Sequence, residues 1–219
     1  MMTFGLGLVV VLVVSFLLGS IPFGVIIGRV GYGKDPRDGG AGSIGMTNMN
    51  RLFGAKAAAL TFVGDVAKGA LAAGFARLLL PHIAAVALWQ VDLVLMFSVL
   101  GSVFGHVFCP WLKFKGGKGI STGLGSLLVA FPAVAISIFI CFLIVAFATK
   151  TISAGSIVAA TAFPIFSLIY HWGSWPYIVI AAIVGGAVVA AHRGNIVRLV
   201  HGTEPKFSLN RNGKDESDD

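Results

Sequence analysis

Three segments of the chain combine glycine, basic residues and small polar residues in a way that suits binding of a phosphate group. They read GGAGSIGMTNMNR at 39–51, GHVFCPWLKFKGGKG at 105–119 and HRGNIVRLVHGTEPKF at 192–207. Glycine allows backbone N–H groups to approach an anion closely. A shorter segment, TISAGS at 151–156, adds two serines after Lys150. Basic loops are ordinary in membrane proteins, but the three segments together favour phosphate binding.

The stretch FKGGKG, residues 114–119, is the most concentrated of these segments. It is not a nucleotide-binding P-loop, because glycine replaces the Ser or Thr that should follow Gly117-Lys118, and position 112 is leucine instead of glycine. We therefore expect a compact nest of backbone N–H groups. In this nest Lys115 and Lys118 would act as point charges for a small phosphate group.

Two other sets of polar residues stand out. Asp65 and Lys68 are three residues apart within an apolar stretch, and charges there usually pair or mark function. We favour a structural ion pair over a functional role. His192 is the strongest functional candidate among the histidines, because Arg193, Asn195 and Arg198 follow it. No metal-binding pattern joins the histidines, so we expect no metal and no cofactor.

Long uncharged stretches separate the polar segments. Of the 219 residues 57% are hydrophobic and only 11% charged, and residues 1–28 and 120–149 carry no charged side chain. A bilayer core of ~30 Å needs about 20 apolar residues of helix. These runs are continuous rather than alternating, which disfavours a β-barrel. The sequence predicts an all-α, multi-pass membrane protein, and the net charge of +7 reflects basic cytoplasmic loops rather than nucleic-acid binding.

We expect seven transmembrane helices, at about residues 4–29, 55–80, 92–108, 120–130, 133–148, 156–170 and 176–191. The fourth is short because Pro132 interrupts an uncharged run that is too long for one span. Seven spans place all but two of the 16 lysines and arginines on one side. The positive-inside rule makes that side cytoplasmic and puts the N-terminus outside. We expect one domain, residues 1–207, and a disordered cytoplasmic tail, residues 208–219.

The three motifs resemble those of the PlsY-type glycerol-3-phosphate acyltransferases of bacterial membranes. GAGSIGMTNMNR is similar to the family's GSGNxGATNxxR, GHVFCPWLKFKGGKGIST to GHxFxxxxxFKGGKGxAT, and HRGNIVRLVHGTEPK to HRxNIxRLxxGxExK. The resemblance implies seven transmembrane helices and an active site built from the cytoplasmic glycine-rich loops. It also implies transfer of an acyl chain from acyl phosphate to the 1-hydroxyl of sn-glycerol 3-phosphate. The products would be lysophosphatidic acid and inorganic phosphate, in the first step of phospholipid synthesis.

The resemblance also assigns roles to individual residues. It implies catalytic roles for His192, Asn195, Lys118 and Lys115. It implies substrate phosphate binding by Gly40, Gly42, Ser43, Thr47, Asn48, Arg51, Gly116, Gly117, Ser153, Ser156, Arg193 and Glu204. No strong nucleophile is apparent, so we expect direct attack by the glycerol hydroxyl, with His192 or a substrate phosphate oxygen as the base. The expected partners are the two substrates and membrane lipid, and the oligomeric state stays open.

Two further observations bear on this hypothesis. The first motif departs from the family pattern, since Ala41 and Ser43 stand where the family has serine and asparagine. Acyltransferases that use CoA thioesters carry aspartate five positions after a histidine, and no histidine here has that spacing. The main alternative is a transporter of phosphate or an organic phosphate. It is disfavoured because the charge lies almost wholly on one side and no internal repeat is visible.

Overall fold

The computed structural model describes residues 1–84 and 87–207, in which helices dominate and no strand is present. The predicted tail, residues 208–219, lies outside the described residues. The α-helices are α1 (Phe4–Gly19), α2 (Phe23–Tyr32), α3 (Met46–Phe53), α4 (Ala55–Leu79), α5 (Leu88–Val107), α6 (Ile120–Ala130), α7 (Pro132–Thr149), α8 (Ile152–Tyr170), α9 (Trp175–Ala191) and α10 (Arg193–Val200). Three short 3₁₀ helices, Pro36–Asp38, Leu80–His82 and Pro110–Leu112, lie in the connections.

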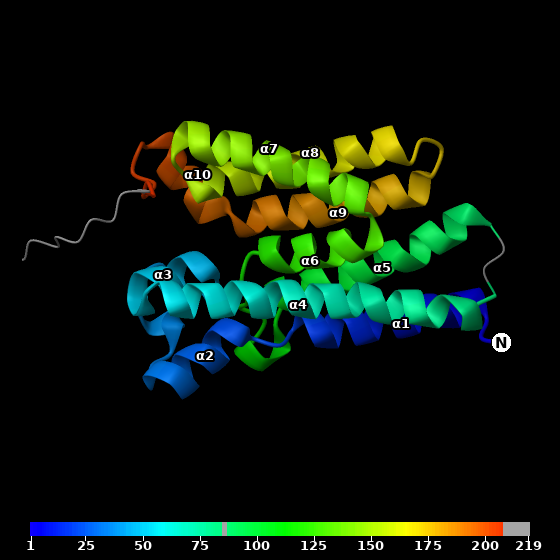
Figure 1. Ribbon diagram of the computed structural model, residues 1–219, viewed down its shortest axis with the longest axis horizontal. Helices are drawn as coiled ribbons and strands as arrows, with labels where there is room; N and C mark the ends of the chain where they lie inside the picture. Colours follow the sequence, from blue (N-terminus) through cyan, green and yellow to red (C-terminus); the bar gives the residue numbers. More distant parts are fainter. Residues whose placement is uncertain (85–86, 208–219) are drawn as a thin grey trace, which may run out of the picture.

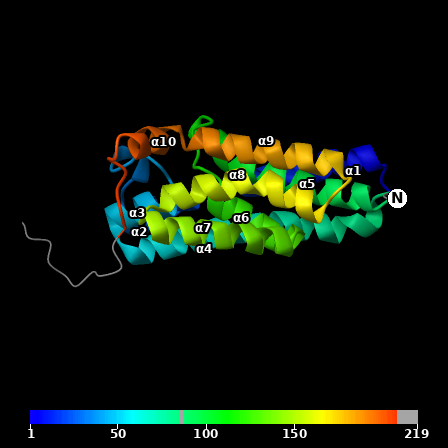
Figure 2. The ribbon, with the colours of Figure 1, turned by 90° about the horizontal axis from the view of Figure 1, so that it is seen from above.

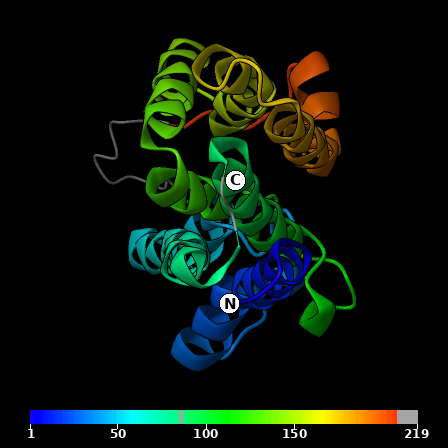
Figure 3. The ribbon, with the colours of Figure 1, turned by 90° about the vertical axis from the view of Figure 1, so that its right-hand side faces the viewer.

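The long helices run along a common direction, and α5 lies in the middle of the bundle (Figure 1). It packs against α1, α4, α6 and α9, while α7 and α8 pack together on the side away from α1. The end view separates α7, α8 and α9 from α1, α2 and α4, with α5 and α6 between them (Figure 3). The buried apolar core is formed around α5 by residues of α4, α6, α7, α8 and α9.

The helices are apolar enough to confirm a multi-pass membrane protein. Within the described residues, five helical segments are long and apolar enough to cross a membrane, namely Phe4–Tyr32, Ala55–His82, Leu88–Leu112, Pro132–Thr149 and Ile152–Tyr170. The pair α9 and α10, bent by 60°, makes a sixth. The short helix α6 occupies its predicted range, but the count of seven spans stays a prediction.

Small residues bring α1 and α5 into close contact. A Cβ atom added to Gly105 would collide with the carbonyl oxygen of Phe16. A Cβ atom added to Gly101 would collide with the carbonyl oxygen of Leu12. Lipid is as apolar as the helices, so association depends on such close packing rather than on hydrophobic burial. The glycines four apart on α5 therefore fix α1 beside it and set the position of the loop that follows α1.

The first predicted helix, residues 4–29, is not continuous. It breaks between Gly19 and Phe23. Pro22 lacks a backbone N–H, and its ring would clash with the preceding turn of a continuing helix. The Ile21 carbonyl freed at the break accepts a hydrogen bond from Lys68 Nζ at 2.8 Å. The sequence predicted the apolar run correctly but not the break within it.

Other boundaries also differ from the predictions. The third predicted helix begins at Leu88 rather than Asp92. Residues 39–51 and 192–207 were predicted to be loops, but α3 begins within the first segment and α10 lies within the second. The helix predicted at 156–170 begins earlier, so the segment 151–156 supplies the N-cap residue and the first turn of α8. Asn48 and Met49 are the buried residues of α3, and Asn195 is the buried residue of α10.

Arg77, one of the two basic residues away from the charged end, completes the end of α6. Its Nε donates to the carbonyl of Val129 at 2.8 Å and its Nη2 to that of Ala130 at 3.1 Å. The last carbonyls of a helix have no partner within the helix and favour a cation. Arg77 thus allows α6 to end inside the bundle.

Candidate functional site

The motif segments gather at one end of the bundle, where α2, α3 and α10 lie together (Figure 2). A cavity of about 1020 Å³ opens between them and continues inward between α5, α6, α7, α8 and α9. Most of the predicted site residues line it, namely Gly40, Ser43, Thr47, Asn48, Arg51, Lys118, Ser153, Ser156, His192, Asn195 and Glu204. Segments far apart in the sequence therefore share one polar mouth.

A chain of hydrogen bonds joins the second and third motifs across this mouth. Lys118 Nζ donates to Asn195 Oδ1 at 2.6 Å, and Asn195 Nδ2 donates to Glu204 Oε1 at 2.6 Å. Arg198 Nε binds the other oxygen of Glu204 at 2.7 Å. Burial lowers the pKa of Lys118, although the Glu204 carboxylate opposes this effect. The chain fixes the Lys118 ammonium on the cavity wall.

His192 is buried at the junction of α9 and α10 and lines the cavity. Its Nδ1 lies 2.8 Å from the carbonyl oxygen of Val188. A carbonyl oxygen only accepts hydrogen bonds, so Nδ1 carries the proton and Nε2 keeps its lone pair. The geometry leaves His192 equipped to accept a proton at Nε2.

The first motif is organised by the side chain of Asn48. Its Oδ1 accepts from the backbone N–H of Ala41 at 2.7 Å, and its Nδ2 donates to the carbonyls of Pro36 and Ser43, each at 2.8 Å. These bonds use the amide to hold the loop. Arg51, one turn further along α3, lines the cavity and makes no hydrogen bond or ion pair with the described residues. Arg51 is therefore available to a ligand.

The predicted phosphate nest at FKGGKG is not formed by Gly116 and Gly117. Their N–H groups donate to the carbonyls of Val107 and His106, each at 3.0 Å, and thus cap the end of α5. A Cβ on Gly116 would collide with the His106 carbonyl, and one on Gly117 with the His106 ring. The glycines serve close packing of the loop on α5. Lys115 is exposed and lies outside the cavity lining.

Two other predicted residues lie away from the cavity wall. Arg193 is exposed on the first turn of α10, and Gly42 sits in the loop before α3 with a positive φ of 63°. Conversely, Arg198 and Lys206 line the cavity without having been assigned to the site. Glu204 could have indicated both residues in the sequence, because a lone carboxylate in a basic segment needs a nearby cation.

The Asp65–Lys68 pair is buried beneath this end of the bundle. Lys68 Nζ lies 2.7 Å from Asp65 Oδ1 and 2.8 Å from His106 Nδ1. Together with the bond to Ile21, these contacts join α4, α5 and the break after α1. Because Gly117 packs on the His106 ring, the cluster also supports the FKGGKG loop. The expected structural ion pair is present, and Asp65 and His106 also reach the cavity wall.

Glu204 gives the mouth a defined response to acid. Burial raises the pKa of its carboxyl, but hydrogen bonds from Asn195 and Arg198 and the positive charge of Arg198 outweigh this and hold the pKa below its ordinary value of 4.5. The stabilisation is therefore complete above pH 4.5 and is lost as the pH falls through the lowered pKa. We expect the difference in melting temperature between the wild type and Glu204→Gln to be constant above pH 4.5 and to shrink below it. A difference that grows on acidification would contradict this assignment.

Among the described residues, no group of three or more His, Cys, Asp or Glu side chains is placed to hold a metal ion.

The fold and the cavity define a multi-pass helical membrane protein with a cationic, polar mouth and an apolar interior. The sequence model of the glycerol-3-phosphate acyltransferase family matches residues 9–202, and the chain belongs to this family. The family predicted from the three motifs is confirmed.

Known relatives match over nearly the whole chain. The glycerol-3-phosphate acyltransferase of Bacillus cytotoxicus is 36% identical over 93% of this chain and 96% of its own length. That of Trichlorobacter lovleyi is 38% identical over 88% and 94%. A crystal structure of PlsY, an integral membrane glycerol 3-phosphate acyltransferase, in the glycerol 3-phosphate form matches with a TM-score of 0.80 and 31% identity. This match covers 92% of this chain and 96% of that one. The lysophosphatidic acid form matches with a TM-score of 0.76 and 30% identity.

Proposed function

We propose that this protein transfers an acyl chain from acyl phosphate to the 1-hydroxyl of sn-glycerol 3-phosphate, giving lysophosphatidic acid and inorganic phosphate. One domain, residues 1–207, would carry this first step of phospholipid synthesis. The observation that supports it most strongly is the cavity, whose cationic mouth continues into an apolar interior. Such a cavity suits a donor with a phosphate head and a hydrocarbon chain. The solved PlsY structures, described as glycerol 3-phosphate and lysophosphatidic acid forms, support the acceptor and the product.

The phosphate groups of the two substrates would be held at the mouth. The guanidinium of Arg51 suits bidentate binding of a phosphate, and the Lys118 ammonium neutralises charge next to it. The hydroxyls of Ser43, Thr47 and Ser153 would donate to phosphate. Ser156 would do so by giving up its bond to the Ile152 carbonyl at 2.9 Å. Glu204 orients Asn195 and Arg198 instead of meeting phosphate itself. The glycines of the first motif, Gly40 among them, allow the backbone of that loop to bend around a ligand.

In the reaction, the oxygen of the glycerol 1-hydroxyl attacks the carbonyl carbon of the acyl phosphate. The bond from that carbon to the phosphate oxygen breaks, and phosphate leaves with the electron pair. The hydroxyl proton passes to a base, for which His192 Nε2 and an oxygen of the departing phosphate are the two candidates. Acyl phosphate is already activated, so positioning and charge neutralisation by Lys118 and Arg51 carry much of the catalysis.

We place the mouth on the cytoplasmic side of a bacterial membrane and the N-terminus on the opposite side. The support is the distribution of charge, because the basic residues other than Lys68 and Arg77 belong to the segments at the mouth and to the chain beyond α9. Both substrates carry phosphate, and a mouth at the cytoplasmic surface suits their phosphate groups. Glycerol 3-phosphate would reach it from the cytosol, and the donor's hydrocarbon chain would enter from the membrane.

The donor is tested with purified protein in detergent or a lipid mesophase. Glycerol 3-phosphate is supplied with palmitoyl phosphate in one series and palmitoyl-CoA in the other, while lysophosphatidic acid and phosphate are followed. We expect lysophosphatidic acid from palmitoyl phosphate alone, with one phosphate released for each product. Product from palmitoyl-CoA alone would replace acyl phosphate as the donor. Product from neither donor, by folded protein, would contradict the proposed function.

A further inference from the structure

The apolar part of the cavity has a definite end. Along α8 the residues on its wall run from Ser153 and Ser156 at the mouth, through Ala159 and Ala160, to Phe163. Within the described chain, no residue of α8 beyond Phe163 reaches the cavity. The distance from Ser153 to Phe163 is ten residues of helix, ~15 Å. This is about half of the ~30 Å hydrocarbon core of a bilayer, which is the depth of one leaflet.

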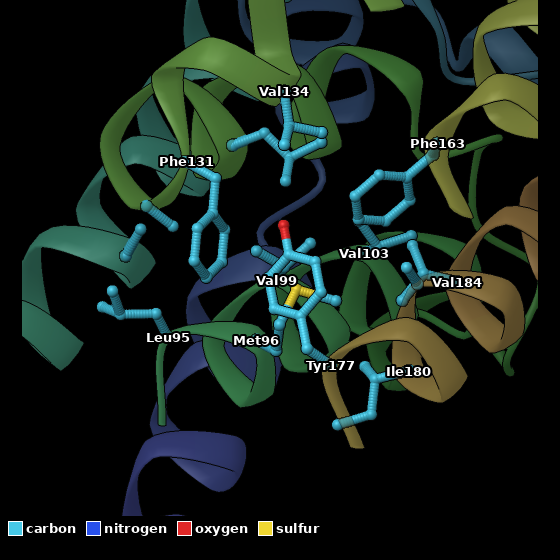
Figure 4. Packing of buried hydrophobic residues seen from close by; sticks show 14 of the residues in the cluster. Leu95, Met96, Val99, Val103, Phe131, Val134, Phe163, Tyr177, Ile180 and Val184 are labelled. Atoms are coloured by element: carbon cyan, nitrogen blue, oxygen red, sulfur yellow. The ribbon is translucent and has the colours of Figure 1, made fainter. Parts of the chain in front are cut away.

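The other helices stop at the same level. The deepest cavity residue is Val99 on α5, Leu127 on α6 and Val184 on α9. Phe163 is the bulkiest of the residues at this level and is almost fully buried, with 3% of its surface exposed. Figure 4 shows it in one cluster with Val99 and Val184. A ring from α8 thus forms a large part of the cavity floor.

Behind the floor the core is filled by stacked rings. Phe131 and Tyr177 (Figure 4) meet edge to face with centroids 4.7 Å apart. His171 stacks on Tyr177 with centroids 4.2 Å apart. Both Phe131 and Tyr177 are buried. Protein interiors are packed as densely as organic crystals, so these rings leave no room for a chain to push further. On α8 the wall above the floor is lined instead by the small residues Ala159 and Ala160.

We propose that Phe163 sets the longest acyl chain that the enzyme accepts, by stopping the chain's methyl end at the cavity floor. The inference rests on the proposed function. Each methylene added above the floor gains burial, which is worth about fourfold in kcat/KM. A methylene that no longer fits is rejected by about tenfold or more. The preferred chain is therefore the one whose end just reaches Phe163.

The test uses full-length protein with glycerol 3-phosphate and lauroyl, myristoyl, palmitoyl, stearoyl and arachidoyl phosphate in turn. For the wild type we expect kcat/KM to rise with chain length to a maximum and then to fall. Phe163→Ala should move the maximum to a longer donor. It should raise kcat/KM for the donor next in length after the wild-type optimum by about tenfold. Ala160→Leu, which narrows the cavity one turn above, should move it to a shorter donor. Phe166→Ala, on the same helix but outside the cavity, should leave the profile unchanged.

Leu127→Ala removes part of a floor side chain on α6 and so deepens the cavity. It provides a second test if Phe163→Ala fails to fold. An unchanged profile in both floor variants, or a shift in Phe166→Ala equal to that in Phe163→Ala, would overturn the inference while product from acyl phosphate left the proposed function standing. No product from any acyl phosphate by folded wild type would overturn both.

Discussion

Lys118→Ala is expected to lower kcat/KM by about 10²–10³-fold, the loss seen when one preorganised donor is removed from a site of developing charge. The Lys118 ammonium lies on the cavity wall and is fixed by Asn195 at 2.6 Å. Its removal leaves substrate phosphate without this charge and also leaves Asn195 Oδ1 without its donor, although Asn195 Nδ2 still donates to Glu204. The measurement is initial-rate kinetics with palmitoyl phosphate and glycerol 3-phosphate on protein of wild-type melting temperature.

Lys115→Ala is the matched control, since it removes the same side chain from the same six-residue stretch. Lys115 is exposed and does not line the cavity. We expect its loss to change kcat/KM by less than about threefold, the scale of a screened surface charge. Equal losses in the two variants would mean that both lysines act on substrate and that the binding site extends beyond the cavity mouth to Lys115.

The contrast between these two lysines illustrates what the sequence could and could not predict. Residue types and motif spacing marked both as phosphate ligands. They lie three positions apart, but the amides of Gly116 and Gly117 between them are bound to the end of α5. That anchoring turns one lysine into the cavity and the other to the surface. It depends on contacts with His106 and Val107, which no local pattern within FKGGKG reveals.

Helices were predictable where the chain has to cross hydrocarbon. A run of apolar residues satisfies its backbone hydrogen bonds within one helix, so its approximate extent follows from charge and proline. The short helix α6 was found in this way, ending before Pro132. Helices α3 and α10 were missed because both are short and rich in polar residues. Helix α3 is fixed by packing on α4, and α10 by the hydrogen bonds of Asn195 and Arg198. The first motif's Asn48 was taken for a ligand because its use in holding the loop depends on contacts with Pro36 and Ser43.

The buried cluster of Asp65, Lys68 and His106 carries the second large effect. Asp65→Ala is expected to lower the free energy of unfolding by about 3–5 kcal/mol, because it leaves the Lys68 ammonium buried without a counter-ion. Its remaining partners, the Ile21 carbonyl and His106 Nδ1, are neutral acceptors at 2.8 Å. The measurement is equilibrium unfolding in detergent micelles titrated with sodium dodecyl sulfate.

Asp65→Ala combined with Lys68→Met distinguishes the charge from the packing. Replacing both partners of a buried ion pair with apolar groups is often close to neutral, so the double variant should regain most of the lost stability. Asp92→Ala serves as the matched control. Asp92 also pairs with a basic side chain, His171 at 3.0 Å, but 24% of its side chain is exposed. Its loss is expected to cost less than about 1 kcal/mol. If the double variant were as unstable as Asp65→Ala, the cluster would act through its shape rather than through its charge.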